Sequence, residues 1–279
     1  MDYLPNIFFA IALFVSIGFF VMNILKLIRN IKLGKDIDRS DRKTERWKNM
    51  ARIALGQSKM VSRPFAGFLH VIVYIGFVVI NIEVLEIVID GLFGTHRVFQ
   101  PLLGNSIYGF LIGTFEILAF LVLVAVILFW LRRNIVKLKR FMSKEMKGWP
   151  KSDGNLILYF EIVLMSLFIV MNATDHTFQE AGFGNPISQF VFPWFSGYSL
   201  DTLAAIEHTA WWVHIIGILI FLNYLYYSKH LHILLAFPNT FFANLDPKGQ
   251  FNNLASVTSE VRIMMDPDAD PYAMPEEGA

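Results

Sequence analysis

Three of the seven histidines in this sequence have a spacing that could hold metal-centred cofactors. His214 and His232 are 18 residues apart, which is five full turns of an α-helix, so we expect them on one face of one helix, about 27 Å apart. A histidine in an apolar environment is costly unless it is paired, hydrogen-bonded or coordinated. Two imidazoles on one stripe at different depths suit two stacked prosthetic groups, whereas a single one is as often a hydrogen-bond partner of a neighbouring helix.

The segments that carry these histidines belong to long apolar blocks. Hydrophobic residues make up 55% of the 279-residue chain and charged residues 17%, against about 45–50% and about 25% in an ordinary globular protein. The blocks are about 20 residues long, the length at which a helix crosses about 30 Å of hydrocarbon. We therefore predict an all-α integral membrane protein, a bundle of five transmembrane helices. The blocks cover residues 3–25, 65–89, 107–131, 156–171 and 203–228.

The basic residues predict how the bundle is oriented. Of the 24 Lys and Arg residues, 12 lie between the first and second spans, 8 between the third and fourth, and 3 after the fifth, which leaves only Arg97 for the other loops. Because basic flanks stay on the cytoplasmic side, we predict an outer N-terminus and a cytoplasmic C-terminus. The first block lacks a basic start and a cleavage site, so we expect it to be retained as a span. The expected location is a bacterial-type inner (cytoplasmic) membrane, crossed several times.

Two regions are expected along the chain: a membrane domain over residues 1–237 and a polar cytoplasmic tail over residues 238–279. The sequence has no cysteine, which excludes a disulfide, a thiolate zinc site and an iron–sulfur cluster held by this chain. It also has no glycine-rich phosphate loop and no nucleophile motif. We therefore assign no catalytic residue, and we expect membrane lipid but no nucleic acid among its partners.

His70 supplies a second imidazole at the depth of His232. It lies seven residues after Arg63, about 10 Å along a helix that starts at the cytoplasmic side. The fifth span descends from outside, so its inner end carries His232 at a depth that agrees to within a turn or two. Two histidines from different helices, facing each other at equal depth, are what a bis-imidazole b-type haem requires. His230, two residues before His232, would point about 160° away on a helix and is expected at the surface.

The second span, SRPFAGFLHVIVYIGFVVIN, and the fifth, WWVHIIGILIFLNYLYYSKHLHI, resemble the b-type cytochrome gamma subunit of respiratory nitrate reductase. They also resemble the membrane subunits of heterodisulfide-reductase-like iron–sulfur oxidoreductases. The resemblance covers roughly residues 1–237 and implies five spans with haem ligands on the second and fifth. It implies His70 and His232 as iron ligands of an inner haem b, and His214 as an iron ligand of an outer haem. It further implies quinone as substrate and a cytoplasmic iron–sulfur subunit as partner.

One position departs from the pattern of that family. The family carries a further histidine ten residues after the inner ligand of the second span, where this chain has Ile80 beside Asn81. Three outcomes stay open for the outer site: a haem held by His214 and His176, a five-coordinate haem held by His214 alone, or no outer haem. His176 follows the fourth span in the sequence NATDHTF, and its alternative interpretation is an interface histidine.

Carboxylates inside the spans are the remaining candidates. Glu83, Glu86 and Asp90 occupy the outer half of the second span, Glu116 lies at similar depth on the third, and Glu161 is expected near the inner end of the fourth. Intramembrane carboxylates are expensive and are usually paired or functional. They are either protonated acids hydrogen-bonded between helices or, for Glu83, Glu86 and Glu116, groups of a quinone or proton site near the outer side.

The function that these residues favour is electron transfer. We expect a haem b membrane subunit of a respiratory oxidoreductase that passes electrons between the quinone/quinol pool and a cytoplasmic iron–sulfur partner. The alternative is a proton- or ion-coupled transporter that uses the intramembrane carboxylates, although unbroken spans without an inverted repeat weigh against it. A cofactor-free membrane anchor for a soluble enzyme is the third interpretation.

Overall fold

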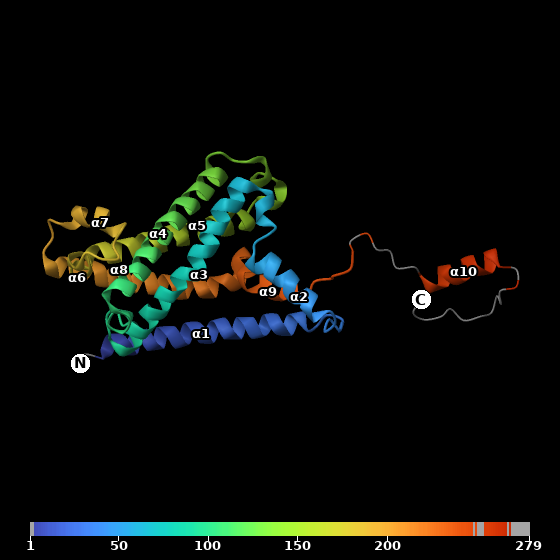
Figure 1. Cartoon of the computed structure of the whole chain (residues 1–279), viewed down its shortest axis with the longest axis horizontal. Coiled ribbons are helices and arrows are strands. Elements are labelled where there is room, and N and C mark those ends of the chain that lie inside the picture. The colour runs from blue at the N-terminus through green and yellow to red at the C-terminus, as the bar shows by residue number, and fades with distance from the viewer. Residues whose placement is uncertain (1–2, 248, 250–253, 267, 269–279) are drawn as a thin grey trace. The chain divides into compact units, whose positions relative to one another are not determined.

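A computed structural model of the chain describes residues 3–247, 249, 254–266 and 268 (Figure 1). These residues form helices and turns and no strand, so the all-α prediction is confirmed. Among them, five helices are long and apolar enough to cross a membrane, as expected. The side of the membrane that each terminus faces stays a prediction. The five spans are α1 (Leu4–Ile31), α3 (Pro64–Phe93), α4 (Phe99–Asn134), α5 (Trp149–Thr174) and α8 (Leu200–Tyr224), which a 3₁₀ turn extends to Tyr227.

The remaining helices are short, and the chain divides into two compact units, Met1–Phe241 and Phe242–Ala279. The first unit contains all five spans, and the described residues of the second contain one helix. The short helices are α2 (Lys43–Met50), followed by a π-helical turn at Ala51–Leu55, α6 (His176–Ala181), α7 (Ser188–Val191), α9 (His232–Phe241) and α10 (Ala255–Met265).

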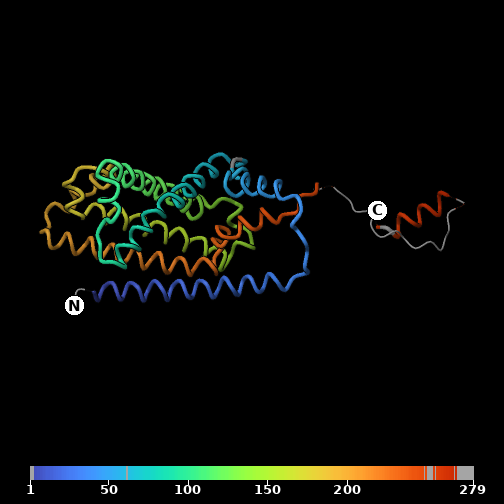
Figure 2. The backbone as a smooth tube through the Cα atoms, turned by 60° about the horizontal axis from the view of Figure 1, so that its bottom comes forward, coloured from blue at the N-terminus to red at the C-terminus, as the bar shows by residue number. Residues whose placement is uncertain are grey.

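The spans of the first unit run side by side, with α6 and α7 at one end and α2 and α9 at the other (Figures 1 and 2). Helix α3 packs on α4, α4 on α5, and α5 on α8, while α1 lies against α3 and α8. Fully buried side chains such as Tyr108, Phe115 and Phe168 fill the centre, and Phe9 of α1 is buried against Ile215 of α8. The outward faces stay apolar, as expected for helices in contact with lipid.

The two ends of the bundle differ in charge. The α1–α3 and α4–α5 connections hold 20 of the 24 Lys and Arg residues, if the residues that flank them are included. We call the end where these connections lie the basic end. The end that carries α6 and α7 is the opposite end.

Helix α5 begins seven residues before the expected start at Leu156, and the reason is a buried contact. The added turn is polar in sequence, but the Asp153 side chain in it is only 3% exposed and accepts a hydrogen bond from Tyr224. The early start lengthens the helix, so Glu161 lies 12 residues, about 18 Å, from its first residue. The expected position of Glu161 near the inner end of the span is therefore wrong.

The fifth span is interrupted before it reaches His232. The backbone of Ser228 is extended (φ −104°, ψ 157°), and α9 starts afresh at His232 after a second 3₁₀ turn. The Ser228 hydroxyl accepts a hydrogen bond from the His230 amide (3.0 Å), as a helix cap does. The expectation that His214 and His232 share a face of one continuous helix is therefore wrong.

Candidate functional site

The structure brings His70 and His232 together at the basic end. His70 lies in the second turn of α3, and His232 is the first residue of α9. Their ring centres are 6.5 Å apart and their ring planes are inclined by 40°. Bonds between a metal and an imidazole nitrogen are about 2.0 Å long and the nitrogen lies about 1 Å from the ring centre, so a metal between two imidazoles holds the centres about 6 Å apart. The observed separation fits such a centre.

The ring nitrogens of this pair are poised for coordination. Nδ1 of His232 lies 2.9 Å from the carbonyl oxygen of Lys229, and because a carbonyl only accepts, Nδ1 carries the hydrogen and Nε2 keeps its lone pair. A metal-bound histidine has the same arrangement, with its other N–H donated to a backbone carbonyl. Nδ1 of His70 is buried and has no hydrogen-bond partner.

Asp153 holds the segment that presents His232. Its carboxylate accepts hydrogen bonds from the Tyr224 hydroxyl (2.6 Å) and from the Lys229 amide (3.1 Å). The Lys229 ammonium in turn donates to the carbonyl oxygen of Pro150 (2.8 Å). The first turn of α5 therefore fixes both sides of the break at Ser228 and sets where α9 begins.

His230 lies beside the pair, so its expected place at the surface is wrong. Its ring centre is 5.5 Å from that of His232 and 5.8 Å from that of Phe221, and its Nδ1 is buried without a partner. Burial and, to a smaller extent, the neighbouring His232 lower the pKa of His230 to about 4, so the ring is neutral near pH 7. The break at Ser228 turns this side chain inward, whereas a continuous helix would have turned it away.

Arg132, near the basic end of α4, adds an unpaired cationic group. Its guanidinium lies over the ring of Phe65, 5.1 Å from the ring centre, and its Nη1 is buried without a hydrogen-bond partner. Phe65 precedes His70 on α3 by little more than one turn. An anionic group bound at this end would satisfy the free N–H.

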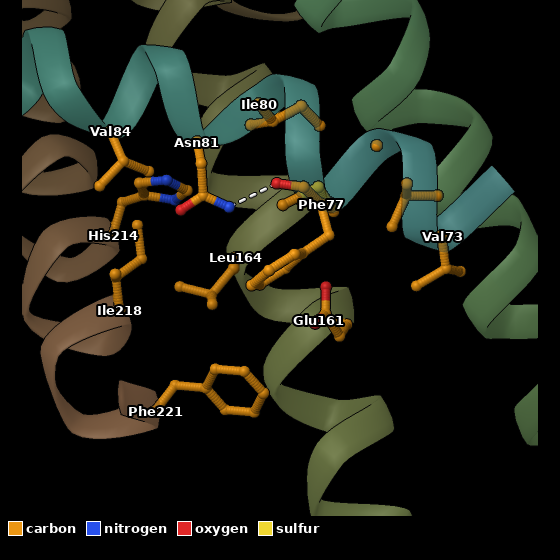
Figure 3. Close-up of a pocket in the computed structure, with 13 residues that line it drawn as sticks. Val73, Phe77, Ile80, Asn81, Val84, Glu161, Leu164, His214, Ile218 and Phe221 are labelled. Carbon is orange, nitrogen blue, oxygen red and sulfur yellow. Dashed lines mark hydrogen bonds between the residues drawn. The ribbon is translucent and has the colours of Figure 1, made fainter. Parts of the chain in front are cut away.

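His214 lines a separate cavity of about 80 Å³ between α3, α4, α5 and α8 (Figure 3). The side chain is 2% exposed, and its Nδ1 has no hydrogen-bond partner. Helix α3 contributes Ile80 and Asn81 to the lining, and α5 contributes Glu161. The other lining residues are mainly apolar, among them Val73, Phe77, Val84, Leu164, Ile218 and Phe221.

At the opposite end, a buried arginine of the α3–α4 loop joins α4, α5 and the residue between α5 and α6. Arg97 donates from Nε to Asp175 (2.9 Å), from one terminal nitrogen to Tyr108 (3.3 Å) and from the other to Asn172 (3.1 Å). Burial by itself lowers the pKa of Arg97, but Tyr108 and then Asp175 more than offset this, so its pKa lies above the ordinary value and the group is charged. The sequence placed Arg97 only in a short outer loop and gave no sign that its side chain turns inward.

The acids expected at a quinone or proton site have different surroundings. Glu116 is fully buried and accepts three hydrogen bonds, from Asn172 (3.0 Å) and from the amides of Ile187 (2.9 Å) and Ser188 (3.0 Å). Glu86 accepts from the Tyr108 hydroxyl and the Phe99 amide. Oε2 of Glu83 is buried without a partner. The contacts of Glu116 favour a structural role.

His176 lies at the opposite end, as the first residue of α6. Its Nδ1 is 3.6 Å from the Glu180 carboxylate, and its ring packs edge-on against Phe192. It does not line the cavity of His214. The structure therefore brings His70 to His232, but it does not bring His176 to His214.

Comparisons with known proteins add two curated relatives. A "Probable iron-sulfur-binding oxidoreductase FadF" of Bacillus subtilis is 28% identical over 246 residues, which is 86% of this chain and 33% of the relative. An "EtfAB:quinone oxidoreductase" of Syntrophomonas wolfei is 23% identical over 250 residues, 85% of this chain and 33% of the relative. This chain thus spans about a third of the length of each. No family model matches it, and no solved structure matches it.

Both relatives are oxidoreductases by name, and the names mention iron–sulfur binding and quinone. This agrees with the oxidoreductase part of the resemblance seen in the sequence. The relationship to the nitrate reductase gamma subunit stays a prediction.

Proposed function

We propose that this chain is the haem b membrane component of an oxidoreductase, passing electrons between the membrane quinone pool and an iron–sulfur partner. The observation that carries the proposal is the approach of His70 and His232 to a ring-centre distance of 6.5 Å. Imidazoles of two helices at this distance, with unshared nitrogens, are a suitable ligand pair for the iron of haem b.

The chain offers residues for each part of that cofactor. His70 and His232 would supply nitrogen ligands to the haem iron, and the buried, unpaired Nη1 of Arg132 would donate a hydrogen bond to a carboxylate of the cofactor. Haem b, when bound, supplies one-electron transfer, and the protein sets its ligation and its burial. Asp153 and Ser228 keep the His232 segment in place for this task.

The partner is proposed from the relatives and from the composition. One relative is named for iron–sulfur binding and the other for quinone, while this chain has no cysteine to ligate a cluster. A partner that carries the clusters must therefore complete the path. We place it at the basic end, on the cytoplasmic side of a bacterial-type membrane, because His232 and α9 lie there.

The transporter alternative has less support. Glu86 and Glu116 make fixed hydrogen bonds to helices and loop amides, so these two acids are poorly placed for an alternating-access cycle. A cofactor-free anchor would have no use for two imidazoles with unshared nitrogens facing each other.

The test is haem content. The protein, expressed with ample haem and purified in detergent, is expected to show the reduced-minus-oxidised spectrum of a b-type cytochrome. His70→Ala and His232→Ala are expected to lose that spectrum. The matched control is His208→Ala, because His208 is an exposed histidine that accepts a hydrogen bond from Trp212. A colourless wild-type protein, or full haem content in both ligand variants, would overturn the proposal.

A further inference from the structure

The cavity of His214 contains three polar side chains in otherwise apolar surroundings. His214 comes from α8, Asn81 from α3 and Glu161 from α5. The Nδ1 of His214 has no hydrogen-bond partner, and the Asn81 amide donates only to the carbonyl of Phe77, one turn back on its own helix. In Figure 3, the side chains of Phe77 and Leu164 are drawn between His214 and Glu161. A buried nitrogen without a hydrogen-bond partner, here Nδ1 of His214, is an arrangement that a bound molecule would explain.

The position of the cavity limits what can enter it. His214 is 14 residues, about 21 Å, from the start of α8, and Glu161 is about 18 Å from the start of α5, so both lie near the middle of their spans. Asn81 is exposed on α3, a helix long and apolar enough to cross a membrane, so we expect its side chain to face lipid. The ligand therefore arrives through the lipid, and it must combine a flat or apolar body with a few polar atoms.

We infer that this cavity binds the head group of a lipid quinone, with His214 and Glu161 as partners of its oxygens and Asn81 at the entrance. The inference rests on the proposed function and names its substrate site. A quinone head group carries two oxygens at opposite ends of a flat ring, so it needs polar groups on both sides of an apolar slot. Phe77 and Leu164 provide the apolar surfaces, and the isoprenoid chain would leave past Asn81 into lipid.

A second haem is the competing occupant. A haem with two histidine ligands at His214 needs a second imidazole at the cavity, but the lining holds no histidine besides His214. His176 is held at the opposite end by Glu180 and Phe192.

The experiment measures binding of a quinone-site probe by a method that does not depend on electron transfer. The purified protein in lipid nanodiscs is titrated with 2-heptyl-4-hydroxyquinoline N-oxide, and binding is read from quenching of the probe's fluorescence. His214→Ala and Glu161→Ala are each expected to weaken binding about tenfold or more, the effect of losing one well-placed hydrogen bond in an apolar site. His208→Ala and Glu207→Ala, which change the same residue types on α8 outside the cavity, are expected to bind like the wild type.

Haem content, measured on the same samples, separates the possible outcomes. The inference is supported if the wild-type protein binds the probe and if His214→Ala binds it more weakly while its haem content is unchanged. Loss of haem in His214→Ala would make the cavity a haem site and overturn it, as would unchanged probe binding in both cavity variants. A wild-type protein without haem that still binds the probe through His214 and Glu161 would overturn the proposed function but not this site.

A second measurement covers the case of misfolded variants. The wild-type protein is irradiated with an azido-quinone, and the labelled peptides are identified by mass spectrometry. Labels on the α3 and α5 segments that line the cavity support the site. Labels confined to other parts of the spans would overturn it.

Discussion

Tyr224 donates a hydrogen bond to Asp153 over 2.6 Å, which joins the last turn of α8 to the first turn of α5. The same carboxylate accepts the amide of Lys229 on the far side of the Ser228 break. Three residues further along the chain, His232 meets His70. One acid therefore sets the geometry of the proposed haem ligand from a distance.

Removal of that acid should disturb His232 without touching it. We expect Asp153→Ala to leave the Lys229 amide unsatisfied, at a cost of about 1–3 kcal/mol, and to loosen the start of α9. The measurement is the low-spin haem signal in electron paramagnetic resonance, which should broaden or shift. Asp153→Asn, which keeps one acceptor, should give a smaller change. A signal identical to the wild type in Asp153→Ala would show that α9 is positioned by other contacts.

Gly76 should be irreplaceable for reasons of space. A Cβ at this position would overlap Cγ2 of Val122 on α4. We expect Gly76→Ala to destabilise the protein by about 1–3 kcal/mol through overpacking, despite the better helix propensity of alanine. The midpoint of thermal unfolding in detergent measures the effect.

Two variants control this prediction. Gly18→Ala lies on α1, where a Cβ has no neighbour within 4 Å, and should be neutral. Val122→Ala in the Gly76→Ala background should restore part of the loss. If Gly76→Ala unfolds at the wild-type temperature, then α3 and α4 are less closely packed than described.

Glu116 should affect stability rather than ligand binding. Glu116→Gln keeps one oxygen that can accept from the amides of Ile187 and Ser188, but its new NH2 group faces the Nδ2 donor of Asn172, so we expect a loss of about 1–3 kcal/mol. Probe binding at the cavity of His214 should stay within about twofold of the wild type, a small energy on this scale. A large loss of binding with wild-type stability would instead give Glu116 a part in the quinone or proton site.

Ile80→His should change the cavity of His214 from a quinone site into a haem site. The new imidazole would face the cavity from α3, opposite His214, where the family resembled by the spans has its second outer ligand. We expect the haem content to rise from one towards two per chain and binding of the quinone-site probe to fall. The measurement is haem per protein in the pyridine haemochrome assay. Unchanged haem content and unchanged probe binding would contradict the proposed roles of both positions.

The pairing of His70 with His232 could be predicted from sequence because depth in a membrane is counted in residues from charged flanks. The break before His232 could not, since it depends on a carboxylate from α5, 75 residues earlier in the chain than Ser228. A continuous helix predicts the wrong direction for His230 for the same reason. The depth of a residue along a helix follows from the number of residues between it and the charged flank, whereas the end of a helix at Ser228 depends on a distant residue, Asp153.

The cavity and the arginine network were still harder to foresee. Asn81, Glu161 and His214 line one cavity only because of how three helices are rotated about their axes, and helices that are apolar on all faces give little sign of that rotation. Arg97 has a positive φ of 54°, and this turn sends its side chain towards Asn172. The spacing of residues in the sequence predicts neither the rotation of the helices nor the φ angle of Arg97.

Arg97 also bears on how the protein is made. Asn172 and Asp175 follow Arg97 by 75 and 78 residues, so a growing polypeptide exposes the cation long before these partners leave the ribosome. Until then, of Tyr108, Asn172 and Asp175, Tyr108 alone is present to accept from the guanidinium, and a charge at the tip of the α3–α4 hairpin is costly to bury. The opposite end of the bundle can therefore close around Arg97 only after α5 has been made.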